Sequence, residues 1–139
     1  MAKVSICDTF SCPVVEKFIE DFEKTINSSP VVLSSNIQKL FSPDTKTVYI
    51  KGNLIFIDSS CLEIAIFLKE VYSSITIDKY RYHYMNWQRK MVFRYDNAQH
   101  HPEISSHPHH KHIKDTVMAS FLPSLRDVLN EISASMLKK

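Results

Sequence analysis

The sequence predicts an α+β fold, with helices near both ends of the chain and an antiparallel β-meander of about five strands between them. Apolar residues recur every three or four positions in residues 13–28 and 124–137, which is the spacing of helices that bury one face. Residues 46–96 contain instead the short apolar and alternating runs that are typical of strands. The chain of 139 residues has the length of one compact domain, so we expect a single domain over residues 1–139.

The composition excludes several classes of function. The formal net charge is only +2, so any basic surface that binds nucleic acid must be local. Gly52 is the one glycine of the chain, which excludes glycine-rich nucleotide-binding loops. The three cysteines form no CxxC pair, and no apolar run approaches the roughly 18 residues of a membrane span. We therefore expect a cytoplasmic protein with reduced thiols and no membrane contact.

The two terminal helices have recognisable boundaries. Pro13 suits a first helical turn, and the Ser-Ser-Pro sequence at 28–30 ends the first helix. Ser124, followed three residues later by Asp127, is a candidate capping box for the last helix. The predicted buried residues are Val15, Phe18, Ile19, Phe22 and Ile26 in the first helix, and Leu125, Val128, Leu129, Ile132 and Met136 in the last. A second, shorter helix is predicted over residues 34–41.

The first three strands are expected between residues 47 and 71. Residues 47–58 are interpreted as a hairpin whose two-residue turn is Gly52-Asn53, because glycine favours the first position of such a turn. That turn would pair Ile50 with Ile55 and Val48 with Ile57. Residues 61–71 are almost continuously apolar, which favours a central strand, with a helix as the alternative.

Residues 78–85 and 90–97 form the fourth and fifth predicted strands. A four-residue connection, 86–89, would pair the aromatic positions on one face: Tyr84 with Met91, Tyr82 with Phe93, and Tyr80 with Tyr95. The other face would then hold His83, with Arg81 opposite Arg94 and Lys79 opposite Asp96. The two arginines either extend into solvent or share an anion or the carboxylate of Asp96. A connection of three or five residues would change this register.

Residues 94–112 contain six of the seven histidines of the chain. We expect residues 97–120 to form a long histidine-rich loop, and long loops within a domain are usually functional or mobile. The cluster allows three interpretations: a metal site, a set of general acids and bases, or a structural loop whose imidazoles are satisfied by the backbone and by carboxylates.

As a metal site, the loop would offer His109, His110 and His112, with Asp96 or Glu103 as a further ligand. His110 and His112 point to the same side of an extended chain. No HExxH or CxxC spacing accompanies them, so a divalent metal is an option that the sequence leaves open and no cofactor is required.

As an acid–base site, the cluster suits RNA cleavage, which needs a base for the 2′-hydroxyl, an acid for the leaving oxygen and a cation for the phosphorane. Histidine titrates near neutrality and serves as acid or base, and arginine grips phosphate with two N–H groups. The candidate catalytic residues are Arg94, Asp96, His101, His110, Lys111 and His112, and the candidate phosphate-binding residues are Arg81, Arg94 and Lys111.

Several blocks of the sequence resemble the TumE family of toxin–antitoxin toxins. The resemblance rests on "KYRYHY", "FRYDNAQHH" and "PHHKH", followed by "SLRDVLNEI", and extends roughly over residues 46–132. "DSSCLEI" resembles a further family segment, although Ser59 stands where glycine is expected. His107 stands where an aromatic residue is common, which makes His107 a poor candidate for an essential role.

The resemblance implies a small toxin whose partner is a helix-turn-helix antitoxin that binds DNA and masks the toxin. No residue roles are carried over from the family. The predicted order of elements is also similar to that of small ribonuclease toxins of the RelE kind. The function expected from the sequence is therefore that of a toxin acting on RNA, with the enzymatic step left open. The alternative is a non-catalytic interaction or metal-binding module, and homo-oligomerisation remains open.

Overall fold

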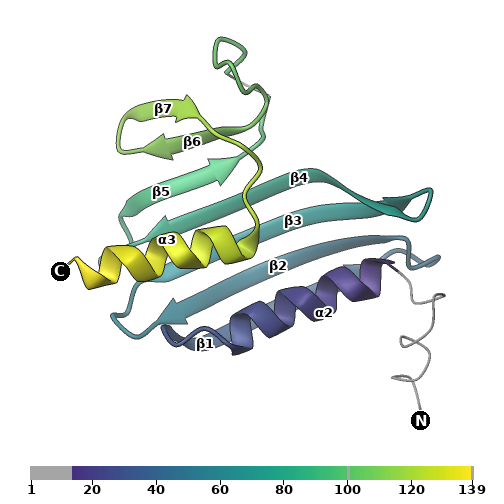
Figure 1. The fold of residues 1–139 in the computed structure, drawn as a ribbon, viewed down its shortest axis with the longest axis horizontal. Helices are drawn as coiled ribbons and strands as arrows, with labels where there is room; N and C mark the ends of the chain where they lie inside the picture. The colour runs from purple at the N-terminus through teal and green to yellow at the C-terminus, as the bar shows by residue number, and fades with distance from the viewer. Residues whose placement is uncertain (1–13, 100, 139) are drawn as a thin grey trace.

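The computed structural model describes residues 14–99 and 101–138, which form an antiparallel sheet and two helices (Figure 1). The sheet has seven strands, not about five, and neighbouring strands follow the order of the chain from β1 to β7. The elements are α2 (Val14–Asn27), β1 (Val32–Phe41), β2 (Thr47–Phe56), β3 (Cys61–Val71), β4 (Ser74–Met85), β5 (Met91–Asp96), β6 (His110–Ile113), β7 (Thr116–Ala119) and α3 (Leu125–Leu137).

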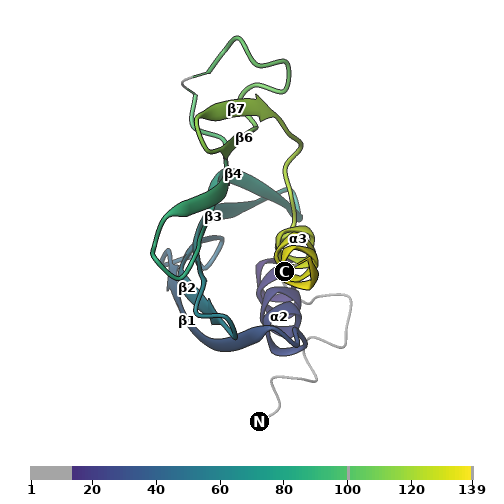
Figure 2. The ribbon, with the colours of Figure 1, turned by 90° about the vertical axis from the view of Figure 1, so that its left-hand side faces the viewer.

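Both helices pack on the same face of the sheet, as the end-on view shows (Figure 2). The buried residues of α2 are Val15, Ile19, Phe22 and Ile26, and those of α3 are Leu125, Val128, Leu129 and Ile132. They meet the inward side chains of β2, β3, β4 and β5 in one core. Neither helix has the length and apolar character that crossing a membrane requires. No described helix lies on the opposite face of the sheet, where the candidate site is found.

Both predicted terminal helices are present. Ser124 caps α3 through the predicted capping box, in which its side chain accepts a hydrogen bond from the backbone of Asp127 and the Asp127 carboxylate accepts one from the backbone of Ser124. The prediction of a helix over residues 34–41 is wrong, because these residues belong to β1. The predicted start at Pro13 lies outside the described residues.

Gly52 does not form a turn. It lies inside the continuous strand β2, opposite Ile37 of β1 and Ile64 of β3. A Cβ on Gly52 would lie only 2.0 Å from the backbone oxygen of Asn36. The glycine is therefore required by the close approach of β1, and the predicted hairpin over 47–58 is replaced by pairing of β2 with β1.

The register between β4 and β5 differs from the predicted one by two residues. The connection contains five residues, 86–90, and a bulge between Tyr84 and Met85 adds a further shift. Beyond the bulge the total shift is even, so Phe93, Arg94 and Tyr95 stay on their predicted faces although their partners change. In the strand register, Arg81 therefore lies opposite Asp96 and not opposite Arg94, and His83 lies opposite Arg94.

Residues 97–120 are not a loop throughout, because they contain β6 and β7, which extend the sheet beyond β5. The four-residue strand β6 pairs Asp96 with His110 and Arg94 with His112. The C-terminal half of the histidine-rich segment is thus part of the sheet, in which β4, β5 and β6 lie side by side (Figure 1).

Candidate functional site

Four polar side chains of β5 and β6 share the face of the sheet that the two helices leave uncovered. Arg94 and Asp96 are two positions apart on β5, and His110 and His112 are two positions apart on β6. Residues with this spacing point to the same face of a sheet. The register places Arg94 next to His112 and Asp96 next to His110. Sheet pairing therefore brings together residues that are 14 to 18 positions apart in the chain.

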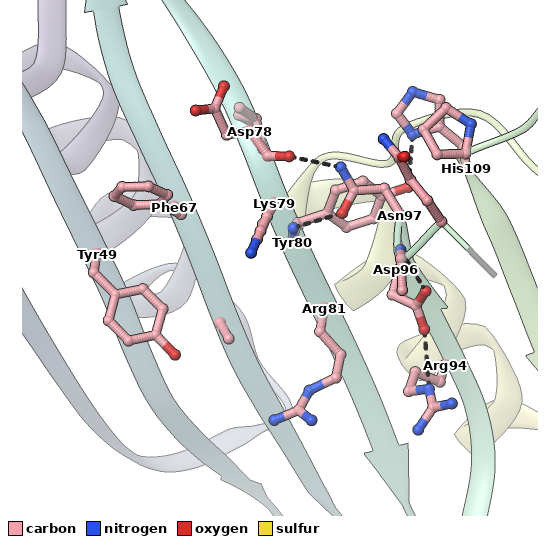
Figure 3. Close-up of a pocket in the computed structure, with 15 residues that line it drawn as sticks. Tyr49, Phe67, Asp78, Lys79, Tyr80, Arg81, Arg94, Asp96, Asn97 and His109 are labelled. Carbon is pink, nitrogen blue, oxygen red and sulfur yellow. Dashed lines mark hydrogen bonds and ion pairs between the residues drawn. The ribbon is translucent and has the colours of Figure 1, made fainter.

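Asp96 is the centre of this group. Its carboxylate is only 8% exposed, and Oδ2 lies 3.1 Å from Nε of Arg94 (Figure 3). Oδ1 lies 2.7 Å from Nε2 of His110, and Oδ2 lies 3.6 Å from Nε2 of His112. Oδ1 also accepts a hydrogen bond from the backbone of Ala98. A buried carboxylate is stable only with such partners, so Asp96 organises the charges around it.

His110 is held in a fixed orientation. Its side chain is 1% exposed, and Nδ1 lies 2.9 Å from the backbone oxygen of Pro108, to which it donates a hydrogen bond. This bond turns Nε2 towards Asp96. A backbone carbonyl that holds Nδ1–H is a common way to select the tautomer and orientation of a functional imidazole.

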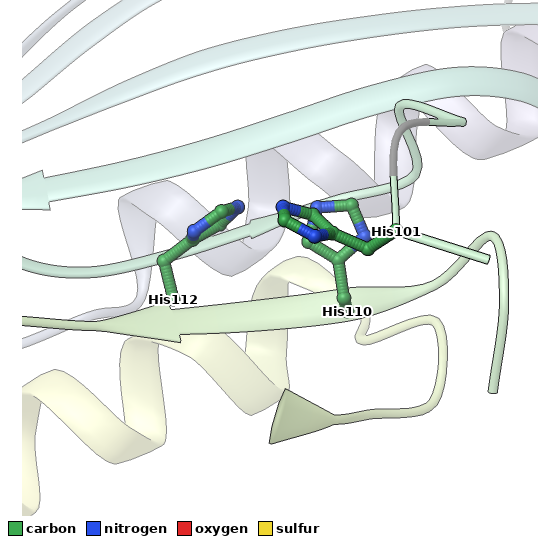
Figure 4. A group of neighbouring side chains, drawn as sticks. All are labelled: His101, His110 and His112. Atoms are coloured by element: carbon green, nitrogen blue, oxygen red, sulfur yellow. The ribbon is translucent and has the colours of Figure 1, made fainter. Parts of the chain in front are cut away.

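His101 completes a cluster of three histidines with His110 and His112 (Figure 4). The ring centroids are 4.8 Å apart for His110 and His112, 5.2 Å for His101 and His110, and 5.7 Å for His101 and His112. One nitrogen from each ring lies within 4.8 Å of the others, so this group could hold a metal ion. Nδ1 of His101 also pairs with Glu103 at 3.1 Å.

The surroundings keep two of the imidazoles on this face neutral. Burial lowers the pKa of His112 below its ordinary value of 6.5, and the positive charge of Arg94 lowers it further. The pKa of His83 is lowered for the same two reasons, in the same order. His112 therefore carries a lone pair near pH 7, as a general base or a metal ligand must.

Lys111 lies apart from this group, because it sits between His110 and His112 on β6 and so points to the helical face. Its ammonium donates a hydrogen bond to Glu131 of α3 at 2.6 Å and lies 4.8 Å from the ring centroid of Tyr95. Burial lowers the pKa of Lys111, but the hydrogen bonds with Glu131 and Tyr95 outweigh it and raise the pKa overall. The structure thus separates Lys111 from the other predicted catalytic residues.

His109 is also outside the cluster, which changes the candidate metal ligands. Its Nδ1 lies 3.0 Å from the hydroxyl of Tyr80, and the two rings stack with centroids 5.7 Å apart. The set His109, His110 and His112 is therefore replaced by His101, His110 and His112. His107 is exposed and His100 lies outside the described residues.

A groove with a volume of about 1250 Å³ lies beside this group, and Arg94 and Asp96 form part of its lining (Figure 3). Arg81 lines it, beside Asp96, as do the aromatic residues Tyr49 and Phe67 of β2 and β3. These two aromatic residues were not among the predicted site residues. The alternation of buried and less buried residues in β2 and β3 is the sequence signal that could have indicated them.

Comparison with known proteins identifies one family. No curated protein and no solved structure shows significant similarity to the chain. The family described as Toxin TumE matches residues 18–136, which is nearly the whole chain. Membership supports the role of a toxin in a toxin–antitoxin module, with an antitoxin as partner. The chain therefore belongs to the TumE family of toxins.

Proposed function

We propose that this toxin cleaves RNA, using imidazoles as general base and general acid and Arg94 as the cation that stabilises the phosphorane. The observation that carries the proposal is the convergence of Arg94, His110 and His112 on the buried carboxylate of Asp96. Such a group of one arginine and several imidazoles supplies the charges that phosphodiester cleavage requires.

Exposure divides the roles within the group. The side chains of Arg94, His101 and His112 are 31%, 25% and 12% exposed, so a bound phosphate could touch them. Those of His110 and Asp96 are 1% and 8% exposed. We therefore assign His112 and His101 to proton transfer, and His110 and Asp96 to positioning the other groups.

The reaction would proceed by attack within the RNA strand. Neutral His112 takes the proton of the 2′-hydroxyl, and the 2′-oxygen forms a bond to the adjacent phosphorus. The bond from phosphorus to the 5′-oxygen breaks, and His101, whose Nδ1–H is held by Glu103, gives a proton from Nε2 to that oxygen. The products are a 2′,3′-cyclic phosphate and a 5′-hydroxyl, and the two imidazoles have exchanged protonation states.

Replacement of Arg94 or His112 by alanine tests this proposal. Each variant is expected to reduce the cleavage rate of a single-stranded RNA by about 10²–10⁴-fold and to relieve growth inhibition in a sensitive host. His107→Ala is the matched control, because His107 is exposed and outside the cluster. Full cleavage and full growth inhibition by both Arg94→Ala and His112→Ala would contradict the proposal.

The pH dependence of cleavage gives a more specific prediction. A base must be unprotonated, so the rate should fall on the acid side with a midpoint below pH 6.5, in line with the lowered pKa of His112. Arg94→Gln removes one cause of that lowering, so the midpoint should move to higher pH in the residual activity. Arg94→Lys retains the charge and should retain the midpoint. Equal midpoints for Arg94→Gln and Arg94→Lys would argue against His112 as the base.

Lys111 is expected to act in stability and not in catalysis. Lys111→Met should lower the free energy of unfolding by about 1–3 kcal/mol, since it leaves Glu131 without the charge-assisted hydrogen bond that Lys111 provides. Cleavage by the folded protein should remain within a few-fold of wild type. Thermal denaturation and a cleavage assay on the same preparation would separate the two effects, and a loss of cleavage without a loss of stability would restore Lys111 to the site.

We further propose that the antitoxin partner is of the helix-turn-helix kind, as the family resemblance implies. Co-expression with the adjacent reading frame should restore growth and allow the two chains to be purified together. A neighbouring frame without a helix-turn-helix pattern that still neutralises the toxin would contradict this identity of the partner.

A divalent metal on His101, His110 and His112 is a second candidate function of the cluster. Nitrogen atoms around a tetrahedral ion are about 3.4 Å apart, so the observed limit of 4.8 Å requires only small side-chain movements. Elemental analysis of protein purified without a histidine tag would test it. One ion per chain, absent from His112→Ala but present in His107→Ala, supports the metal site. Cleavage that survives chelation supports the metal-free mechanism.

A further inference from the structure

The groove beyond the histidine cluster has the chemistry of a binding site for single-stranded RNA. Its walls come from β2, β3, β4, β5 and the residues that follow β5, and they include Tyr49, Phe67, Lys79 and Arg81 as well as Arg94 and Asp96 (Figure 3). Extending the proposed function, on which this inference rests, we propose that an unpaired base stacks on the ring of Tyr49 and contacts Phe67 with its edge, while Lys79 and Arg81 bind the flanking phosphates.

The strand register aligns these residues in two rows across the sheet. One row runs from Tyr49 to Phe67 and on to Lys79. The neighbouring row runs from Lys51 through Ala65 to Arg81, then Asp96 and His110. The first row therefore places Lys79 beside the two aromatic residues. The second row places Arg81 next to Asp96 and His110 of the proposed site. Ala65, within the second row, has a small side chain and lines the groove.

The cations of the groove differ in their partners. Asp78 pairs with Lys69 at 3.2 Å, and Asp96 pairs with Arg94. In contrast, no carboxylate of the described residues forms an ion pair with Lys79 or Arg81. Both side chains are exposed. Two exposed cations without carboxylate partners, next to the cluster, fit the phosphates of a polyanion.

The aromatic pair provides the second part of the site. Tyr49 and Phe67 meet edge to face, with centroids 6.5 Å apart and an interplanar angle of 85°. Tyr49 is 38% exposed although it is a large aromatic residue on a sheet surface. Aromatic rings beside cations are the usual platform for unpaired bases, because every base has a face that can stack. A duplex hides its base faces, so the arrangement selects single strands.

Fluorescence anisotropy with a labelled 2′-O-methyl oligoadenylate would test the proposal in the full-length toxin. This probe has no free 2′-hydroxyl, so binding is measured without cleavage by the proposed route. Tyr49→Ala should weaken binding about tenfold, which corresponds to the loss of one stacked base. Lys79→Ala and Arg81→Ala should each reduce the slope of log K against log salt concentration by about 0.7. All three residues are exposed, so the variants should fold.

Lys24→Ala is the matched control, because Lys24 is exposed on α2, on the opposite face of the sheet. Affinities of Tyr49→Ala and Arg81→Ala equal to that of Lys24→Ala would overturn the groove, even if Arg94→Ala abolishes cleavage. Groove-dependent binding without any RNA cleavage would instead overturn the proposed function and leave the groove standing. Equal binding of a matched duplex would overturn the selection of single strands.

Discussion

Asp96→Ala should lower the free energy of unfolding by about 3–5 kcal/mol, the usual effect of removing one partner from a buried ion pair. The carboxylate is 8% exposed, and it contacts the side chains of Arg94, His110 and His112. Without it, the guanidinium of Arg94 and the two imidazoles would face one another with no negative charge between them. Urea denaturation measures the change.

Asp78→Ala is the control for this prediction. Asp78 also pairs with a cation, Lys69, but that pair is exposed, so its loss should cost no more than about 1 kcal/mol. Asp96→Ala should also abolish RNA cleavage under conditions in which the protein remains folded, because the imidazoles and Arg94 lose their orientation. A loss of stability equal to that of Asp78→Ala would show that Asp96 does not organise the site.

Gly52→Ala should destabilise the protein by roughly 3–5 kcal/mol, which is a large effect for the addition of one methyl group. The new Cβ would lie 2.0 Å from the backbone oxygen of Asn36 and 2.8 Å from Cα of Ile37. The φ angle of Gly52 is +154°, a value that residues with a side chain rarely adopt. The steric clash would be removed if β1 moved away from β2.

Asn53→Ala, at the next position of the same strand, is the control and should change the stability little. Chemical denaturation gives the size of the effect, and hydrogen exchange at the β1 amides shows whether β1 separates from β2. A Gly52→Ala variant as stable as Asn53→Ala would mean that β1 does not pair with β2 in this register.

The two terminal helices and the faces of β4 and β5 were predictable because their signals are local, whereas the hairpin predicted over 47–58 placed Ile55 and Ile57 on the core face, from which Ile57 is absent because it is 60% exposed. The repeat of apolar residues in α2 and α3 and the capping box at Ser124 depend only on residues within a few positions of one another. Alternation along β4 and β5 likewise placed Tyr82 on the core face and Arg94 on the other face, even though the predicted register was wrong by two residues.

Partners across the sheet could not be predicted in this way. Gly52 is compatible with a turn or with a close neighbouring strand, and only the presence of β1 distinguishes them. The pairing of Arg81 with Asp96 depends on a bulge at Tyr84 that has no clear sequence signal. The sequence predicts a loop over residues 110–119, because four-residue strands such as β6 and β7 show too little alternation to be recognised.

By itself, the sequence determined the two terminal helices, the faces of Tyr82 and Arg94 in β4 and β5, the candidate polar residues and, through its motifs, the TumE family resemblance that the family match over residues 18–136 bears out. Only the tertiary structure decided that His101 joins His110 and His112 while His109 and Lys111 do not. The physical reason is that the direction of a side chain follows from its own strand, whereas its neighbours across the sheet follow from pairing between distant segments.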